Sequence, residues 1–102
     1  MVKHVILWKL REEYSGAEID RIKKGIKEGL EGLMGQIPGM IAISVITEPL
    51  ASSNCDVMLD SAFESEEALR GYSTHPAHVA VANEKVRPFT ATRICMDYSV
   101  DE

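Results

Sequence analysis

The chain alternates between two hydrophobic periodicities, and the order in which they occur limits the folds open to it. Apolar residues recur at every second position in four segments and at helical spacing in two others. The predicted strands are 2–10, 40–47, 56–63 and 91–98, and the predicted helical regions are 15–36 and 65–86, the second broken at His75-Pro76. This order predicts an α+β fold of the ferredoxin-like βαββαβ type, with one antiparallel four-stranded sheet and its helices on one face.

The predicted strands carry apolar residues on both faces. In the first strand, His4, Ile6 and Trp8 alternate with Val5 and Leu7. In the second strand, the two sides are Ile41, Ile43 and Val45 against Met40, Ala42 and Ile46. Helices on one face leave the other face bare, and the sheet of a second subunit is the simplest cover for it. We therefore expect a homodimer in which two sheets face each other.

The first helical region has a capping motif and one apolar stripe. Ser15 and Glu18 fit a capping box at the helix start. The predicted core stripe is Ile19, Ile22, Ile26, Leu30, Leu33 and Ile37. The charged residues off this stripe are interpreted as a solvated face: Lys23, Lys24, Lys27, Glu28 and Glu31. Three glycines each weaken the helix by about 1 kcal/mol relative to alanine, which suggests close packing against a partner element: Gly25, Gly29 and Gly32.

The composition favours one domain spanning residues 1–102. A net charge of −5 and a pI near 5.2 leave no basic footprint for nucleic acid. The first residues lack the features of a signal peptide, and no apolar run approaches the roughly 18 residues that span a bilayer. We expect a cytoplasmic protein with no nucleic-acid or membrane partner. Cys55 and Cys95 have no CxxC spacing and are expected as reduced thiols, with a single disulfide as the alternative.

The segment 71–79 combines the main acid–base candidates of the chain, Tyr72, His75 and His78, around Pro76. Because proline suits the first position of a helix and disfavours helix in the residue before it, His75 is predicted as a cap and His78 falls in the first turn. Free N–H groups at that end disfavour imidazolium, so His78 is expected to be neutral. A neutral imidazole beside the Tyr72 phenol is a candidate proton-transfer pair. The alternative is structural, with a histidine bonded to the chain and a tyrosine packed beneath the helix.

The histidines also suggest a metal site, in which His75 and His78 form an H-x-x-H pair and His4 adds a third ligand. A capping His75 points away from the inward face of the first turn, however, and no cysteine or carboxylate obviously converges on the pair. We therefore expect no metal bound through these side chains.

Five stretches match one known family in chain order. They are residues 2–7 (VKHVIL), 36–39 (QIPG), 63–69 (FES followed by EAL at 67–69), 72–79 (Tyr-x-x-His-Pro-x-His-Val) and 97–98 (DY). Together they resemble the stress-responsive dimeric α/β-barrel (Dabb) family, and the likeness covers nearly the whole chain. The resemblance implies a ferredoxin-like protomer and a two-fold dimer whose sheets form a barrel.

Some plant members of that family are polyketide cyclases that work without metal or organic cofactor. Carried over by position, the resemblance implies that Tyr72 orients a substrate, that His78 is the general base and that His4 lines the pocket. The ligand-binding set expected between helices and sheet is His4, Ile6, Trp8, Ile26, Leu30, Tyr72 and His78. The chain departs from the cyclases where aliphatic residues replace the pocket aromatics of the first helix, and Trp8 is expected to narrow any cavity.

Three functions remain open at this point. The first is a module that binds a small hydrophobic or phenolic ligand near His4, Tyr72 and His78. The second is a cofactor-independent cyclase or lyase with His78 as base and Tyr72 as orienting donor. The third is a stress-associated dimer without chemistry. The first two functions lead us to expect an internal cavity of at least about 300 Å³ that reaches both Tyr72 and His78.

Overall fold

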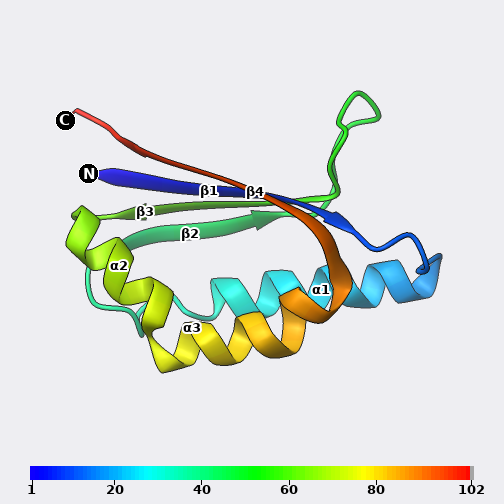
Figure 1. Ribbon diagram of the computed structural model, residues 1–102, viewed down its shortest axis with the longest axis horizontal. Helices are drawn as coiled ribbons and strands as arrows, with labels where there is room; N and C mark the ends of the chain where they lie inside the picture. Colours follow the sequence, from blue (N-terminus) through cyan, green and yellow to red (C-terminus); the bar gives the residue numbers. More distant parts are fainter. Residues whose placement is uncertain (102) are drawn as a thin grey trace.

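The predicted order of elements is confirmed by a computed structural model, which describes residues 1–101 (Figure 1). The elements are β1 (Val2–Leu10), α1 (Ala17–Glu31), β2 (Met40–Ile46), β3 (Val57–Phe63), α2 (Glu66–Thr74), α3 (Pro76–Val81), a π-helical turn (Ala82–Val86), a 3-10 turn (Arg87–Phe89) and β4 (Thr90–Ser99). The first helix is shorter than the predicted 15–36, because the chain turns away at Gly32 and continues to Gln36 as a series of turns.

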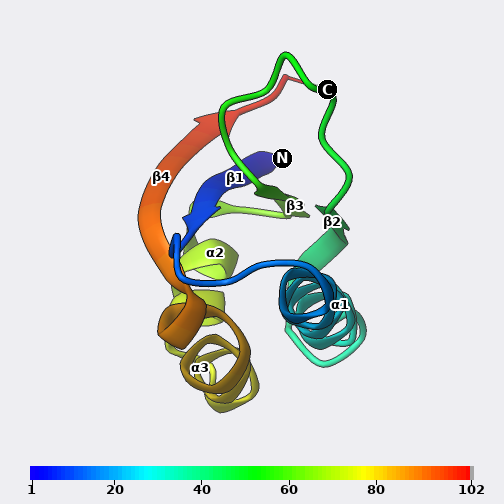
Figure 2. The same ribbon diagram turned by 90° about the vertical axis from the view of Figure 1, so that its right-hand side faces the viewer.

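The four strands form one antiparallel sheet in the order β2-β3-β1-β4. Figure 2 shows α1 and the α2–α3 pair side by side beneath this sheet, with β4 curving along one edge. The first and last strands are therefore neighbours, and His4 of β1 lies opposite Asp97 of β4 on one side and opposite Ser61 of β3 on the other. This pairing positions the candidate site.

The core lies between the sheet and the helices. Alternate residues of β1 are buried on the helix side, as the strand pattern predicted. Their partners across the layer come from the apolar stripe of α1, from β3 and from α2: Ile22, Ile26, Leu30, Leu59, Phe63, Leu69 and Tyr72. Leu33 and Ile37 are also buried, although they lie in the turns after α1 rather than in the helix.

The predicted faces of β2 are partly wrong. A register shift between Met40 and Ala42 leaves Ile41 as an extra residue in the strand. Met40 therefore shares the buried side with Val45, while Ile41 is exposed. A simple alternation cannot anticipate such a bulge, because one extra residue exchanges the two faces beyond it.

The predicted capping box at the start of α1 is also wrong. Gly16 is the N-cap, with a φ of 54°, and the helix begins at Ala17. The N–H of Glu18 contacts the backbone carbonyl of Ser15 at 3.2 Å rather than its hydroxyl. The left-handed backbone at position 16 moves the cap one residue beyond the serine, because glycine adopts that conformation without steric cost.

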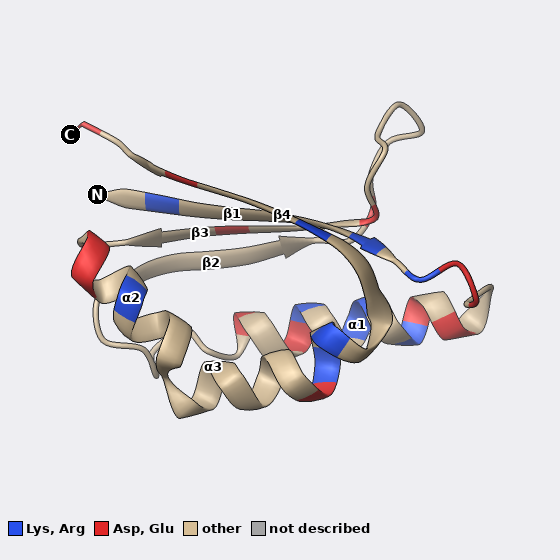
Figure 3. Ribbon diagram, in the orientation of Figure 1, with Lys and Arg blue, Asp and Glu red and all other residues tan. Residues whose placement is uncertain are grey.

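Part of the charged face of α1 has a structural role that the interpretation as a solvated face missed. Lys27 Nζ donates to the carbonyl of Val45 at 2.8 Å, and Glu31 Oε2 accepts from the N–H of Val45 at 2.9 Å. Lys23 Nζ donates to the carbonyl of Thr47. These contacts satisfy backbone groups on the outer edge of β2. Figure 3 shows charged residues concentrated on α1 and the loop before it, with few on the strands.

The face of the sheet away from the helices is largely apolar. Val5 and Leu7 of β1 lie on it, opposite Met96 and Ile94 of β4. Ile94 is 59 % exposed and Met96 is 66 % exposed. Ile46 of β2 extends the apolar area across the sheet.

Two glycines make close contacts between elements. A Cβ on Gly29 of α1 would lie 2.9 Å from Cγ1 of Val81, so this glycine lets α1 approach α3 closely. Gly39 has a φ of 81°, and a Cβ there would lie 2.5 Å from Cβ of Ala68. The expectation of close packing therefore holds for Gly29, whereas a Cβ on Gly25 would meet only a lysine side-chain carbon at 3.6 Å.

Gly29→Ala and Gly25→Ala should shift stability in opposite directions. In Gly29→Ala the new methyl group would clash with the stiff, β-branched side chain of Val81 and push α1 away from α3. We therefore expect a loss of about 1–3 kcal/mol in the free energy of unfolding. Gly25→Ala gains helix propensity without a clash, and we expect a gain of about 0.5–1 kcal/mol. Urea unfolding of both variants checks this, and equal effects at the two positions would contradict the packing described.

Candidate functional site

The site begins at the break between α2 and α3. Ser65 caps α2 by accepting a hydrogen bond from the N–H of Ala68 at 3.1 Å. His75 then ends α2 in an extended conformation and caps α3, because its Nδ1 accepts from the N–H of Ala77 at 3.1 Å and Pro76 follows at the first helical position. The predicted capping role of His75 is thus confirmed, and the chain changes direction between α2 and α3.

This turn brings two aromatic rings of the motif into contact. The centroids of Tyr72 and His78 are 4.1 Å apart, with their planes tilted by 34°. The Tyr72 ring also packs against Phe63 at 5.1 Å and against the edge of His4 at 5.9 Å. Tyr72 therefore lies at the centre of an aromatic cluster that joins β1, β3 and α3, and its contact with His78 is a ring stack.

The hydroxyl of Tyr72 is buried without a hydrogen-bond partner within residues 1–101. The side chain is only 1 % exposed. Burial raises the pKa of Tyr72 to about 12, and the charge of Arg93 opposes this effect. The phenol is therefore neutral at physiological pH and keeps a donor proton, which is costly to bury unpaired.

His78 is held as a neutral imidazole. Its Nδ1 lies 3.3 Å from the carbonyl of Ser73, an acceptor, so Nδ1 carries the proton and Nε2 keeps a lone pair. Burial is the main cause that lowers the pKa of His78, and the positive charges of Arg87, His4 and Arg93 lower it further, while the bond to Ser73 acts in the opposite direction. The expected direction is confirmed, and burial is its largest cause.

A cavity of about 170 Å³ lies between the sheet and the helices beside this cluster. His4, Tyr72 and His78 all line it, together with Ile6, Trp8 and Leu30 from the predicted ligand-binding set. Ile26 is fully buried in the core but is not among the lining residues. Arg87, Thr90 and Arg93 add polar groups that the sequence reading did not include.

The expected volume of at least about 300 Å³ is wrong. Trp8 and Leu30 are both buried and both form part of the wall, so their bulk occupies space that smaller residues would leave empty. Neither fills the cavity completely. The site is therefore shaped for something smaller than a folded polyketide chain.

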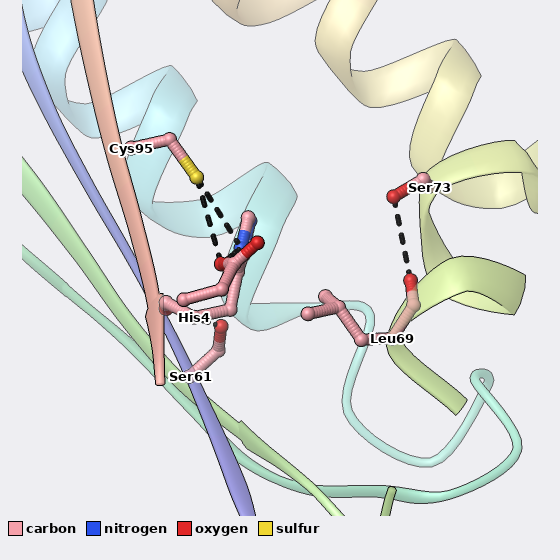
Figure 4. A network of polar contacts seen from close by, with 6 residues as sticks. His4, Ser61, Leu69, Ser73 and Cys95 are labelled. Carbon is pink, nitrogen blue, oxygen red and sulfur yellow. Dashed lines mark hydrogen bonds and ion pairs between the residues drawn. The ribbon is translucent and has the colours of Figure 1, made fainter. Parts of the chain in front are cut away.

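A cluster of polar side chains, formed by His4 of β1 with Cys95 and Asp97 of β4, lies beside the cavity (Figure 4). His4 Nδ1 lies 2.5 Å from Oδ1 of Asp97, and Cys95 Sγ lies 3.5 Å from the same oxygen and 3.9 Å from His4 Nδ1. Burial and the Asp97 carboxylate raise the pKa of Cys95. Ser61 Oγ donates to the backbone carbonyl of His4 at 2.8 Å, which fixes the strand beneath the imidazole.

The expectation that no cysteine or carboxylate converges on the histidines of the H-x-x-H set is corrected for His4 alone, which meets Cys95 and Asp97. Residues 95 and 97 alternate to the same face of β4, and antiparallel pairing of the first and last strands places that face beside His4. The sequence pattern that indicates this cluster is the Cys-x-Asp spacing on β4, and it points to His4 only once β1 and β4 are paired in the correct register. Cys55 lies elsewhere and is half-buried, and both cysteines are free thiols.

The fold and the cavity define a ferredoxin-like α+β protein with a small, mainly apolar site between its sheet and helices. The chain belongs to the stress-responsive A/B barrel domain family, whose model matches residues 2–100. Part of the chain is 32 % identical over 84 residues to an uncharacterized protein of Streptomyces coelicolor, covering 78 % of this chain and 81 % of that protein.

Solved structures agree with this assignment. A dimeric protein of unknown function and ferredoxin-like fold from Bacteroides fragilis is 29 % identical, with a TM-score of 0.89 over 97 % of this chain and 95 % of that one. A protein from Arabidopsis thaliana is 27 % identical, with a TM-score of 0.74 over 100 % of this chain and 97 % of that one. Among the described residues, no helix has the length and apolar character needed to cross a membrane.

Tyr72→Phe should leave the folded protein at least as stable as the wild type at neutral pH. The change removes a buried hydroxyl without a partner, so we expect the free energy of unfolding to stay level or to rise by up to about 2 kcal/mol. The difference should grow between pH 10 and 12, because the unfolded phenol ionises near pH 10 while the folded one resists until about 12. Urea unfolding across this range measures both effects, and a clear loss at neutral pH would show that the hydroxyl has a partner.

Proposed function

We propose that this protein binds a small ligand about the size of one aromatic ring, carrying a hydrogen-bond acceptor and an acidic group. The observation that carries the proposal is the buried, unpartnered hydroxyl of Tyr72, a residue that lines the cavity. A buried donor without an acceptor costs free energy, and an oxygen atom of a ligand recovers it.

The size of the cavity sets the size of the ligand. An apolar protein cavity of about 150 Å³ is known to hold benzene, and the cavity here measures about 170 Å³. Ile6, Trp8, Leu30 and Leu59 supply apolar walls for such a ring. A monocyclic phenol or a benzoate therefore fits, whereas a bicyclic compound exceeds the available volume.

The charge around the cavity favours an acid. Arg87 and Arg93 both line it, and both lower the pKa of His78 through their charge. Guanidinium groups pair well with carboxylates. A hydroxybenzoate combines the three features that the site offers: a ring for the apolar walls, an acceptor for Tyr72 and a carboxylate for arginine.

Binding of 4-hydroxybenzoate, benzoate, phenol and 2-naphthoate tests the proposal by calorimetry. We expect the two monocyclic acids to bind more tightly than phenol, and naphthoate to bind most weakly. Tyr72→Phe should weaken the binding of 4-hydroxybenzoate about tenfold, the equivalent of about 1.4 kcal/mol. Arg93→Gln should weaken the acids but not phenol, and Arg70→Gln, which lies outside the cavity, serves as its control.

A matched pair of core variants checks the size argument. Leu30→Ala should open the cavity and improve the binding of naphthoate, at a cost of about 2–5 kcal/mol in stability. Leu33→Ala removes the same atoms from a buried position that does not line the cavity, so it should lose similar stability without gaining naphthoate binding. Equal naphthoate affinity in both variants, or no binding of any probe to the wild type, would overturn the proposal.

A second candidate function, a cofactor-independent lyase or cyclase, is favoured by His78. Its Nδ1 is bonded to Ser73 and its pKa is lowered, so Nε2 is available as a base at neutral pH. Tyr72 would then orient a substrate through its hydroxyl. Turnover of a bound probe that is lost in His78→Ala without loss of binding would support chemistry, and binding without turnover would leave a binding module.

We further infer that two copies associate through the outer faces of their sheets. That face carries Val5, Leu7, Ile94 and Met96, and apolar patches of this kind mark association sites. The related protein from Bacteroides fragilis is described as dimeric. A two-fold pair would cover the same patch on each copy.

Met96→Asp should convert the dimer to a monomer at micromolar concentration, because each interface would bury two uncompensated carboxylates. Met34→Asp is the control, since Met34 is also exposed but lies in the turns after α1, away from this face. Light scattering with size-exclusion chromatography measures the outcome. A monomeric wild type, or a Met96→Asp variant that remains dimeric, would contradict this assembly.

A further inference from the structure

We propose that His4, Cys95 and Asp97 form a zinc-binding site on the inner face of the β1–β4 pair. Each offers one ligand atom, and the three atoms lie within 4.8 Å of one another. The site adjoins the cavity of the proposed organic ligand, since His4 lines that cavity, but its three donors come from strands and include neither Tyr72 nor His78.

Strand geometry alone places the three donors together. Cys95 and Asp97 are two residues apart on β4 and so point to one face, and His4 lies directly opposite Asp97 and next to Ile6, the partner of Cys95. His4 is buried and held by core packing, so one ligand is already in a fixed position. Sites built on strands hold their ligands more precisely than sites on loops.

The distances suit a tetrahedral ion after one small movement. Bonds of about 2.0 Å to nitrogen and oxygen and about 2.3 Å to sulfur place the ligand atoms of a tetrahedral zinc about 3.3–3.6 Å apart. The Cys95–Asp97 distance of 3.5 Å and the Cys95–His4 distance of 3.9 Å are close to this. The 2.5 Å between His4 and Asp97 is shorter, as a hydrogen bond requires. Asp97 is 46 % exposed on an edge strand, so its carboxylate is free to turn outward and admit an ion.

The donor set selects the ion. Imidazole nitrogen and thiolate sulfur bind zinc well, whereas magnesium and calcium prefer all-oxygen sites. Three protein ligands leave a fourth position for water, as in catalytic zinc sites. The thiol gives its proton to solvent on coordination, and thiolate and carboxylate together balance the charge of Zn²⁺. Arg93 is a positive charge that would repel the ion, because it alternates to the same face of β4 and acts on Cys95.

Competition between the protein and a chromophoric chelator, with metal content measured on the isolated protein, tests the site. We expect one Zn²⁺ per chain, and Co²⁺ in its place should show a sulfur-to-cobalt charge-transfer band with tetrahedral visible bands. Cys95→Ser and Asp97→Asn should weaken zinc binding by at least about 100-fold. This exceeds the loss typical of residues that only hydrogen-bond to a metal ligand. Arg93→Gln should tighten it, since a repelling charge is removed.

Controls separate the site from other metal-binding groups. Cys55→Ser and His75→Asn should bind zinc as the wild type does, because neither residue belongs to the cluster and asparagine retains the cap at position 75. Cys95→His should keep zinc but lose the charge-transfer band. Zinc affinity unchanged by Cys95→Ser, or cobalt bound without a sulfur band, would overturn the proposal. Loss of 4-hydroxybenzoate binding with zinc binding retained would count against the proposed function alone.

Discussion

The packing of the Tyr72 ring between the sheet and α3 is the interaction on which the rest of the site depends. The Tyr72 ring packs against the rings of His4, Phe63 and His78. This enclosure excludes water from the phenol, which raises the pKa of Tyr72 and leaves its hydroxyl unpartnered. The same desolvation lowers the pKa of His78 and keeps it neutral. One packing arrangement therefore sets the protonation state of both groups and forms a wall of the cavity.

The position of this ring follows from local backbone chemistry. Pro76 cannot continue α2, and His75 caps the next helix through its own side chain. The chain changes direction at this break, so the rings at positions 72 and 78 meet although a continuous helix would separate them along its axis. The break at His75-Pro76 therefore brings Tyr72 and His78 into contact.

Most of the fold could be predicted from the sequence because strand and helix periodicities are local properties. The strands fall within one residue of their predicted ends, and the caps at Ser65 and His75 follow from nearby residues. The errors arise where one residue changes the register. A left-handed Gly16 moves the start of α1, and the bulge at Ile41 exchanges the faces of β2. Neither can be read from hydrophobic spacing.

The candidate site was only partly predictable for a different reason. Tyr72 and His78 lie in one continuous motif, whereas Cys95 and Asp97 reach His4 only through the pairing of the two ends of the chain. The volume of the cavity depends on how Trp8 and Leu30 pack, and rotamers of large side chains are not determined by sequence spacing. Long-range register and side-chain packing are therefore what sequence reasoning could not supply.

The two edges of the sheet differ, and the difference decides which edge is open to a further strand. At the β2 edge, Lys23, Lys27 and Glu31 bond to backbone groups of Val45 and Thr47, whereas β4 forms the opposite edge with no fifth strand beside it in residues 1–101. Unlimited strand addition needs two open edges on every chain, one to accept and one to offer. With groups at the β2 edge bonded to side chains, an added strand finds its open backbone groups along β4, so helix side chains far from the cavity direct strand addition to one edge of the sheet.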